Sequence, residues 1–237
     1  MLKKRSQIAI IDYGLGNIFS IRHGFKQVGL TADITSSRKD ILDADAVILP
    51  GVGSFGDAMN ALKRLDLVKP LQDIAQSEKP LIGICLGLQL LFTQSYEFGQ
   101  HKGLDIISGE VLPFEVYQDK GMKYKVPQVC WNRIFEPGDN TSSSPPSLHP
   151  EIWKSCLLKG VESGAYMYFV HSFFTAPENS SVVVATTTYG RTEFCSGVKK
   201  GNVEAFQFHP ERSGPKGLKI YRNLYNLLNQ KKGKSNE

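Results

Sequence analysis

The chain has 237 residues, of which 41% are hydrophobic and 22% are charged, and its formal net charge is +5. That length and apolar content suffice for one substantial core, so we expect a single domain over residues 1–237 with its core at about 7–228. No apolar run reaches membrane-spanning length, and the basic start lacks the apolar stretch of a signal peptide. We therefore expect no membrane association and a cytoplasmic location.

The first part of the chain alternates between strand and helix patterns. In order, the pattern predicts a strand at 7–12, a helix at 17–28, a strand at 46–49, a helix at 57–76 interrupted near Pro70, and a strand at 81–84. The middle changes character, with short strands expected around 109–116, 129–135, 167–170 and 182–187, and a helix at 218–228 closes the chain. This order predicts a three-layer α/β fold whose open, mainly parallel sheet is flavodoxin-like and carries extra antiparallel strands.

Two segments depart from this pattern. Residues 136–150 are rich in Pro and Ser and poor in apolar residues, which predicts a flexible surface loop. The basic tail at 229–237 is of a kind that is solvated in most proteins, and no stripe of interleaved aromatic and basic residues accompanies it. We therefore expect no nucleic-acid partner. The four cysteines show neither metal-ligand spacing nor disulfide density, which indicates a reducing compartment and no metal site.

A cysteine stands where the predicted strand at 81–84 meets a helix-like run of leucines. Residues 83–89 read Gly-Ile-Cys-Leu-Gly-Leu-Gln, and the apolar residues from Leu86 to Phe92 suit a helix packed on a sheet. This is the arrangement of the nucleophile elbow, G-x-S-x-G, with Cys in place of Ser. Flanking glycines permit a strained turn, and the N–H groups of a starting helix favour a thiolate. A buried cysteine is more often a small apolar residue, so Cys85 alone does not establish a nucleophile.

A second motif supplies the groups that a nucleophilic cysteine needs. Residues 203–208 read as a strand, and His209 and Glu211 follow at its end with a proline between them. Two residues apart in extended chain, these side chains point the same way, so the carboxylate can fix the orientation of the imidazole. Cys85, His209 and Glu211 together therefore indicate a Cys-His-Glu catalytic triad.

These motifs resemble the class I (triad) glutamine amidotransferases. The segments around Cys85 and His209 mark that wider family, and others are similar to its members that serve as glutaminase subunits of imidazole glycerol phosphate synthase. These are Asp-Tyr-Gly-Leu-Gly-Asn at 12–17, Pro-Gly-Val-Gly at 50–53, Lys-Val-Pro at 125–127, Trp-Asn at 131–132, Tyr-Phe-Val-His-Ser at 168–172 and His-Pro-Glu-Arg-Ser-Gly at 209–214. The resemblance runs from about residue 7 to about residue 228.

The resemblance implies a glutaminase that uses no cofactor. Cys85 would attack the side-chain amide of L-glutamine to form a glutamyl thioester, and His209 would protonate the departing ammonia and then activate water, while Glu211 orients it. The resemblance implies an oxyanion hole at Val52, Gly53 and Leu86, with Gly53 permitting a backbone flip. The residues that it implies for substrate binding are Gly51, Gln89, His171, Ser172 and Phe173.

The resemblance also implies a partner protein. Ammonia would pass to a separate cyclase subunit with a (β/α)8 barrel, so that the two subunits form a heterodimer in histidine biosynthesis. Asn17, Trp131 and Arg212 match family positions at or near that interface.

The chain departs from the family pattern at two positions. The family usually reads Lys-x-Pro-His-x-Gly-Trp-Asn, whereas this chain has Gln128 for the His and Cys130 for the Gly. The triad is unaffected, so the departure concerns the partner. It leaves open a similar glutaminase subunit that supplies ammonia to a sugar-aminating partner in surface polysaccharide biosynthesis. A stand-alone cysteine hydrolase and a non-catalytic regulatory scaffold are further alternatives, and the intact triad argues against the scaffold.

Overall fold

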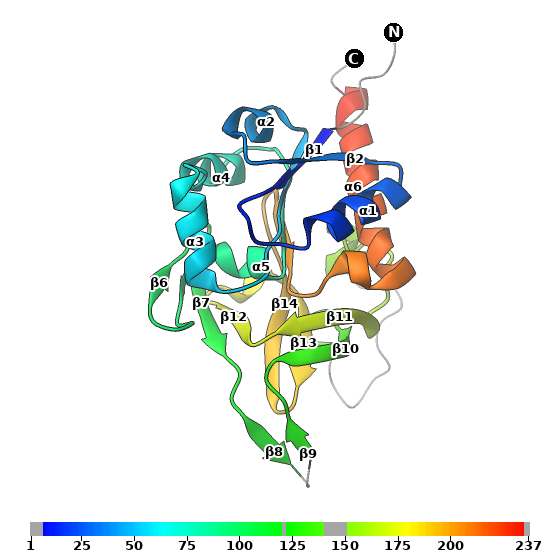
Figure 1. Ribbon diagram of the computed structural model, residues 1–237. Helices are drawn as coiled ribbons and strands as arrows, with labels where there is room; N and C mark the ends of the chain where they lie inside the picture. The colour runs from blue at the N-terminus through cyan, green and yellow to red at the C-terminus, as the bar shows by residue number, and fades with distance from the viewer. Residues whose placement is uncertain (1–6, 120–121, 140–150, 235–237) are drawn as a thin grey trace.

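The computed structural model describes residues 7–119, 122–139 and 151–234, and it shows a central sheet with helices on both faces (Figure 1). The strands are β1 (Gln7–Ile11), β2 (Thr31–Thr35), β3 (Ala46–Leu49), β4 (Leu81–Ile84), β5 (Phe92–Ser95), β6 (His101–Lys102), β7 (Ile107–Pro113), β8 (Tyr117–Asp119), β9 (Met122–Tyr124), β10 (Gln128–Ile134), β11 (Ala165–His171), β12 (Phe173–Pro177), β13 (Val183–Tyr189), β14 (Thr192–Lys200) and β15 (Val203–Phe206). The α-helices are α1 (Ile18–Gln27), α2 (Arg38–Asp43), α3 (Phe55–Arg64), α4 (Val68–Ala75), α5 (Leu86–Leu90) and α6 (Gly214–Lys234), and the short 3-10 helices are η1 (Ile152–Ser155), η2 (Ser180–Val182) and η3 (Pro210–Arg212).

The main sheet has a parallel half and a mostly antiparallel half, in which only β5 and β7 of the described strands pair in parallel. Within the described ranges its order is β2-β1-β3-β4-β15-β14-β12-β7-β5-β6, with β13 beside β14. The strands from β2 to β15 in that order run parallel, and the sheet turns antiparallel at the β15–β14 pair. Because parallel strands end at the same edge, the segments that follow β1, β3, β4 and β15 meet there.

Helices cover the two faces of the sheet as separate layers. Alternate residues of β1 divide between two cores: Ile8 and Ile10 belong to one, and Ala9 and Ile11 belong to the other. Helices α1 and α6 lie together on one face, while α2, α3 and α4 lie on the other (Figure 1). Phe25 of α1 stacks on Tyr221 of α6 with ring centroids 4.1 Å apart. Burying each large side chain contributes about 1.5–3 kcal/mol, and this packing holds the parallel strands in register.

Two antiparallel ribbons complete the fold. Strands β10 and β11 pair from Gln128 opposite His171 to Ile134 opposite Ala165, and β8 pairs with β9. Figure 1 shows β10 and β11 across the lower part of the main sheet, near β13 and β14, with the β8–β9 hairpin projecting below them. Within the described residues, no helix is long and apolar enough to cross a membrane.

The structure confirms the α/β fold and most of the predicted elements, including β3 and β4 at their predicted bounds. The expected helix after Cys85 is wrong beyond Leu90, because Phe92 begins β5 and pairs with β7. The break in the predicted helix at 57–76 falls at 65–67, where Asp66 has φ of 54°, and not at Pro70. Pro70 lies in the first turn of α4, where its missing N–H costs no helical hydrogen bond.

The two segments that depart from the alternating pattern are ordered at their starts. Helix α6 continues to Lys234, so the start of the basic tail is helical. Glu136, the first residue of the expected flexible loop, is buried, and its carboxylate accepts hydrogen bonds from the backbone N–H groups of Glu151 and Ile152. Residues 140–150 of that loop lie outside the described ranges.

Close packing around the glycines of the α5 region gives a stability prediction. A Cβ on Gly87 would overlap the Leu49 carbonyl oxygen, whereas a Cβ on Gly29 would meet nothing within 4 Å. Gly87→Ala should therefore cost about 3 kcal/mol of unfolding free energy, the upper end of typical overpacking costs. Gly29→Ala, the control, should cost about 1 kcal/mol because φ there is +82°. Urea unfolding measures both, and equal costs would contradict the close approach.

Candidate active site

Four chain segments meet where the parallel strands end. Tyr13 follows β1, residues 50–53 follow β3, Cys85 follows β4, and His209 lies three residues after β15. All of these segments leave the same edge of the sheet, the position at which open α/β sheets bind ligands. The topology therefore brings together residues that lie far apart in the sequence.

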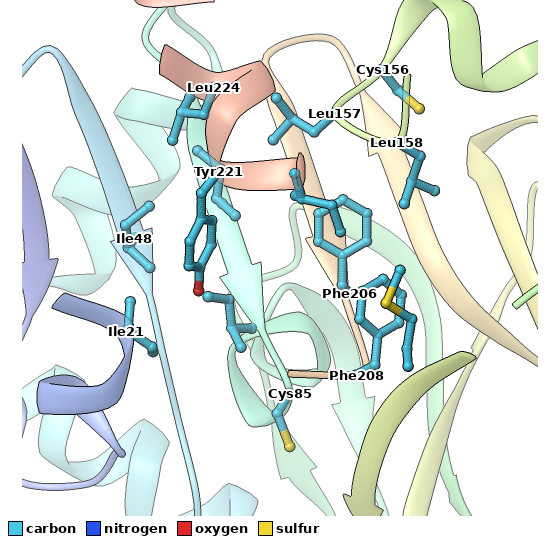
Figure 2. Packing of buried hydrophobic residues seen from close by; sticks show 14 of the residues in the cluster. Ile21, Ile48, Cys85, Cys156, Leu157, Leu158, Phe206, Phe208, Tyr221 and Leu224 are labelled. Atoms are coloured by element: carbon cyan, nitrogen blue, oxygen red, sulfur yellow. The ribbon is translucent and has the colours of Figure 1, made fainter. Parts of the chain in front are cut away.

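Cys85 occupies a strained turn between β4 and α5. Its φ is 56° and its ψ is −111°, a conformation that costs a non-glycine residue on the order of 1–3 kcal/mol. Its N–H donates to the Phe206 carbonyl at 2.8 Å and its carbonyl accepts from the Leu88 N–H at 3.0 Å. A Cβ on Gly83 would lie 2.8 Å from the Ala205 Cβ, so the approach to the turn requires glycine. Figure 2 shows the Cys85 sulfur pointing away from the packed rings of Phe206 and Tyr221.

His209 is held by its backbone and by a buried carboxylate. Its Nδ1 donates to Glu211 Oε1 at 2.8 Å, and the Glu211 side chain has no exposed area (0%). Tyr221 Oη donates to the other carboxylate oxygen at 3.4 Å. The His209 N–H donates to the Tyr168 carbonyl at 2.9 Å, and Ser213 Oγ donates to the His209 carbonyl at 2.6 Å. The imidazole is therefore fixed in position and in orientation.

The electrostatics of this pair favour a charged imidazole beside the sulfur. Burial by itself lowers the pKa of His209, but Cys85 and then Glu211 raise it to about 10. Nε2 is buried and has no hydrogen-bond partner among the described residues, so it is free to act on a group placed between it and Cys85. The arrangement can supply a nucleophilic sulfur, a proton donor and an orienting carboxylate.

A cavity of about 240 Å³ opens beside the Cys85 sulfur. This volume is below the roughly 300–1,000 Å³ of sites for drug-sized ligands, so it suits a molecule as small as an amino acid. The residues that line it are Val52, Gly53, Cys85, Leu86, Gln89, Glu97, Pro127, Val170, His171, Ser172 and Phe173. The structure thus brings most of the predicted oxyanion and substrate residues to one cavity.

Gly51 is the predicted substrate residue that lies outside this lining. A Cβ there would lie 2.5 Å from Tyr13 Oη and 2.8 Å from the Leu86 Cβ, so the segment passes between these two side chains. Tyr13 Oη donates to the Pro50 carbonyl at 2.5 Å and fixes the start of the segment. Gly53 has φ of +98°. Glycines therefore let residues 50–53 pass close to Cys85 and adopt a left-handed turn.

Backbone and side-chain groups at the far wall are joined by hydrogen bonds. The Phe173 carbonyl accepts from Gln89 Nε2 at 3.0 Å and from His171 Nδ1 at 2.8 Å. Burial, partly opposed by this bond to Phe173 and assisted by His209, lowers the pKa of His171 to about 4. His171 is therefore neutral at physiological pH, with Nδ1 donating to the Phe173 carbonyl and Nε2 left as an acceptor.

Sequence reasoning missed two polar residues of the site. Glu97 lies in the loop after β5, lines the cavity, and accepts the Phe55 N–H through Oε2. Burial raises its pKa, although the Phe55 N–H and His101 oppose this effect. No sequence motif surrounds Glu97. Gln207 is fully buried and its Nε2 donates to Cys85 Sγ at 3.7 Å. In the sequence, its position two residues before His209 indicated that Gln207 could lie near the site.

The predicted interface residues lie at the same edge of the molecule. The Arg212 guanidinium sits over the Tyr168 ring, 4.3 Å from its centroid, and the Trp131 ring also packs against Tyr168, with the two ring centroids 6.1 Å apart. Asn17 precedes α1, which packs against η3. Trp131 is half exposed (52%) although it is large and apolar.

The two residues that depart from the family pattern point away from that surface. In β10, alternate residues face opposite sides, so Gln128 and Cys130 share the face opposite to that of Trp131. Gln128 is fully buried, and its Nε2 donates to Cys130 Sγ at 3.6 Å. Cys130 pairs with Phe169 of β11. These substitutions therefore change the more buried face of the ribbon and not the face that carries Trp131.

The comparisons with known proteins agree with this geometry. The family model for "Glutamine amidotransferase class-I" matches residues 9–227. The chain belongs to the class-I glutamine amidotransferase family. It is therefore a glutamine-hydrolysing enzyme.

Curated relatives cover almost the whole chain. The imidazole glycerol phosphate synthase subunit HisH of Syntrophotalea carbinolica is 45% identical over 92% of this chain and 98% of its own length. The HisH subunit of Geobacter metallireducens is 44% identical over 92% of this chain and 96% of its own length.

Solved structures of distant amidotransferases share the fold. PurLQS from Thermotoga maritima has a TM-score of 0.64 at 20% identity and covers 95% of this chain and 100% of its own. The glutaminase domain of Trypanosoma brucei CTPS, solved with bound acivicin, has a TM-score of 0.57 at 16% identity and covers 93% of this chain and 94% of its own.

The raised pKa of His209 predicts a pH-dependent contribution to stability. A folded-state pKa of about 10, against 6.5 for an ordinary histidine, contributes stability that is fully present below pH 6.5 and lost as pH rises through 10. Glu211→Gln removes one cause of the shift, so it should destabilise the protein more at pH 6 than at pH 10. Urea unfolding at both pH values measures this.

The matched control is Glu162→Gln, which breaks an exposed pair with Lys216. Such pairs contribute little at either pH. An equal cost of Glu211→Gln at pH 6 and pH 10 would contradict the assigned coupling.

Glu97 is expected to bind the ammonium group of the substrate, because its carboxylate is the acidic group in the cavity lining. In Glu97→Gln, the side-chain oxygen can still accept the Phe55 N–H, but the negative charge is lost. The KM for glutamine should rise about tenfold, since a hydrogen bond to a charged group contributes about 1.5–3 kcal/mol. Steady-state kinetics of glutamate release measure this, and exposed Glu115→Gln is the control. An unchanged KM would exclude this role.

Proposed function

We propose that this chain is the glutaminase subunit of imidazole glycerol phosphate synthase, and that Cys85, His209 and Glu211 are its catalytic triad. The observation that carries the proposal is the strained Cys85 turn in the lining of a small cavity, with the His209–Glu211 pair beside Cys85. The HisH relatives, which align over almost the whole chain, support the pathway assignment.

The reaction follows from the positions of these groups. The Cys85 sulfur attacks the side-chain amide carbon of glutamine, and the tetrahedral oxyanion is stabilised by the backbone N–H groups of Val52 and Leu86, which line the cavity. The His209 imidazolium gives its proton to the leaving nitrogen, so the C–N bond breaks and ammonia departs. Neutral His209 then takes a proton from water, whose oxygen attacks the thioester. Collapse releases glutamate and restores the sulfur and the imidazolium.

An exposed apolar face beside the site supports a protein partner. Val129 and Trp131 of β10 and Tyr166 of β11 are each at least half exposed, and they project from the same ribbon face that carries Tyr168. Aromatic residues and arginine are enriched in protein interfaces, so Trp131 and Arg212 are suited to this role. The proposed partner is a (β/α)8-barrel cyclase that receives the ammonia, and we place the complex in the cytoplasm.

The inward placement of Gln128 and Cys130 favours this partner over a sugar-aminating one. A change of partner would be expected to alter the exposed face, whereas these two side chains contact each other on the opposite face of β10, where Gln128 is fully buried and Cys130 is partly buried. The exposed Trp131 and Arg212 retain the family residues that the resemblance assigns to the interface.

The function is tested by separating the two sources of ammonia. Cys85→Ala should abolish glutamine-dependent formation of imidazole glycerol phosphate by the complex, because the nucleophile is lost. With ammonium salt supplied instead of glutamine, synthesis by the cyclase subunit should continue at the wild-type rate. Product formation is measured with both nitrogen sources.

The control is Cys195→Ala, which removes a buried cysteine of the sheet. It should leave glutamine-dependent synthesis unchanged. Glutamine-dependent synthesis that survives in Cys85→Ala would refute the nucleophile, and failure of the wild type to support the cyclase subunit would refute the partner.

A further inference from the structure

A buried series of amide hydrogen bonds connects the cavity wall to the Cys85 sulfur. Gln89 Nε2 donates to the Phe173 carbonyl and to Gln207 Oε1, both at 3.0 Å. Gln207 Nε2 in turn donates to Cys85 Sγ at 3.7 Å. Gln207 is fully buried and its backbone N–H is held by the Ser196 carbonyl at 3.0 Å. The side chain is therefore fixed at both ends.

The orientation of the Gln207 amide follows from the chemistry of its neighbours. A carbonyl oxygen only accepts hydrogen bonds, so the amide group of Gln89 must present its NH2 to Phe173. Because this NH2 also faces Gln207, the Gln207 atom that meets it must be the oxygen. The NH2 of Gln207 is then left for Cys85. The direction of each bond is thus set by a main-chain group.

We propose that Gln207 is a catalytic residue that donates a hydrogen bond to the Cys85 thiolate and stabilises it for attack on glutamine. The inference rests on the proposed role of Cys85 as the nucleophile. A donor favours the charged form of its acceptor. The Val170 carbonyl favours the protonated form instead, because it accepts a hydrogen bond from the Cys85 S–H, with 3.8 Å between Sγ and the carbonyl oxygen. Gln207 supplies the thiolate with a partner that Val170 cannot provide.

The titratable groups around Cys85 are less suited to stabilise its thiolate than the neutral Gln207 amide is. Burial and the Cys85 charge raise the pKa of Tyr13, which keeps its proton and donates a hydrogen bond to the Pro50 carbonyl. His171 is neutral and its Nδ1 is occupied by Phe173. Glu97 lies across the cavity and adds negative charge, while His209 supplies positive charge. His209 also has to give up its proton during the reaction, whereas the Gln207 amide keeps its own throughout.

The experiment measures alkylation of Cys85 by iodoacetamide between pH 5 and pH 9 in the full-length chain, with the Cys85 peptide followed by mass spectrometry. Gln207→Met keeps the size of the side chain and removes the donor. It should slow alkylation at pH 7 about tenfold and move the half-maximal rate upward by about one pH unit. Gln207→Glu keeps the acceptor for Gln89 but places an oxygen against the sulfur, so it should slow alkylation further.

Ser196→Ala is the matched control, because it alters a buried side chain beside Gln207 and keeps the carbonyl that holds it. Its pH profile should equal that of the wild type. A profile unchanged in both Gln207 variants would overturn the inference, as would equal slowing in both with no shift along the pH axis. Near-UV circular dichroism establishes whether each variant is folded. If Gln207→Met is not folded, the pH profile of Gln207→Glu tests the inference by itself.

The reagent does not resemble glutamine, so this test is separable from the proposed function. If Cys85 reacts in the wild type and both Gln207 variants keep the wild-type pH profile, only the role of Gln207 is refuted. If Cys85 of the wild type does not react, its assignment as the nucleophile is refuted, and so is this inference.

Discussion

The backbone conformation of Cys85 is the constraint on which the rest of the site depends. A positive φ turns the chain out of β4 so that the sulfur leaves the sheet on the side of His209. The strain, on the order of 1–3 kcal/mol, persists because the neighbours leave no room for another path. Gly87 packs against the Leu49 carbonyl, and Gly83 packs against Ala205, so β3, β4 and β15 hold the turn from three sides. The packing of the parallel strands around this turn thus fixes the position of the nucleophile.

Two kinds of hydrogen-bond network converge on this sulfur. One is charged: Tyr221 and Glu211 hold His209, which carries the positive charge and the mobile proton. The other is neutral and consists of amide groups that begin at the Phe173 carbonyl in the cavity wall. Both are buried, where an electrostatic interaction is stronger than in water. Gln89 and Phe173 of the neutral network also line the cavity, so this network supports both the cavity wall and the sulfur.

The sequence predicted the parts of this site that local patterns encode. Cys85 and His209 each follow an apolar run that predicts a strand, and parallel strands end at the same edge of a sheet. Glu97 could not be found in this way, and the motif that contains Tyr13 did not reveal its role, because their contacts with Phe55 and Pro50 exist only in the folded chain. The helix after Cys85 was predicted too long for a related reason. Leucine and phenylalanine suit a buried strand as well as a helix, and the pairing of Phe92 with β7 decided the outcome.

The most direct test of the account is to trap the intermediate on Cys85. The proposed complex with the cyclase subunit would be mixed with glutamine and quenched in acid, and its peptides would be analysed by mass spectrometry. The account predicts a glutamyl group on the peptide that contains Cys85, formed and lost within the time of turnover. Steady glutamate release with Cys85 unmodified at every time point, or a glutamyl group on another residue, would contradict it.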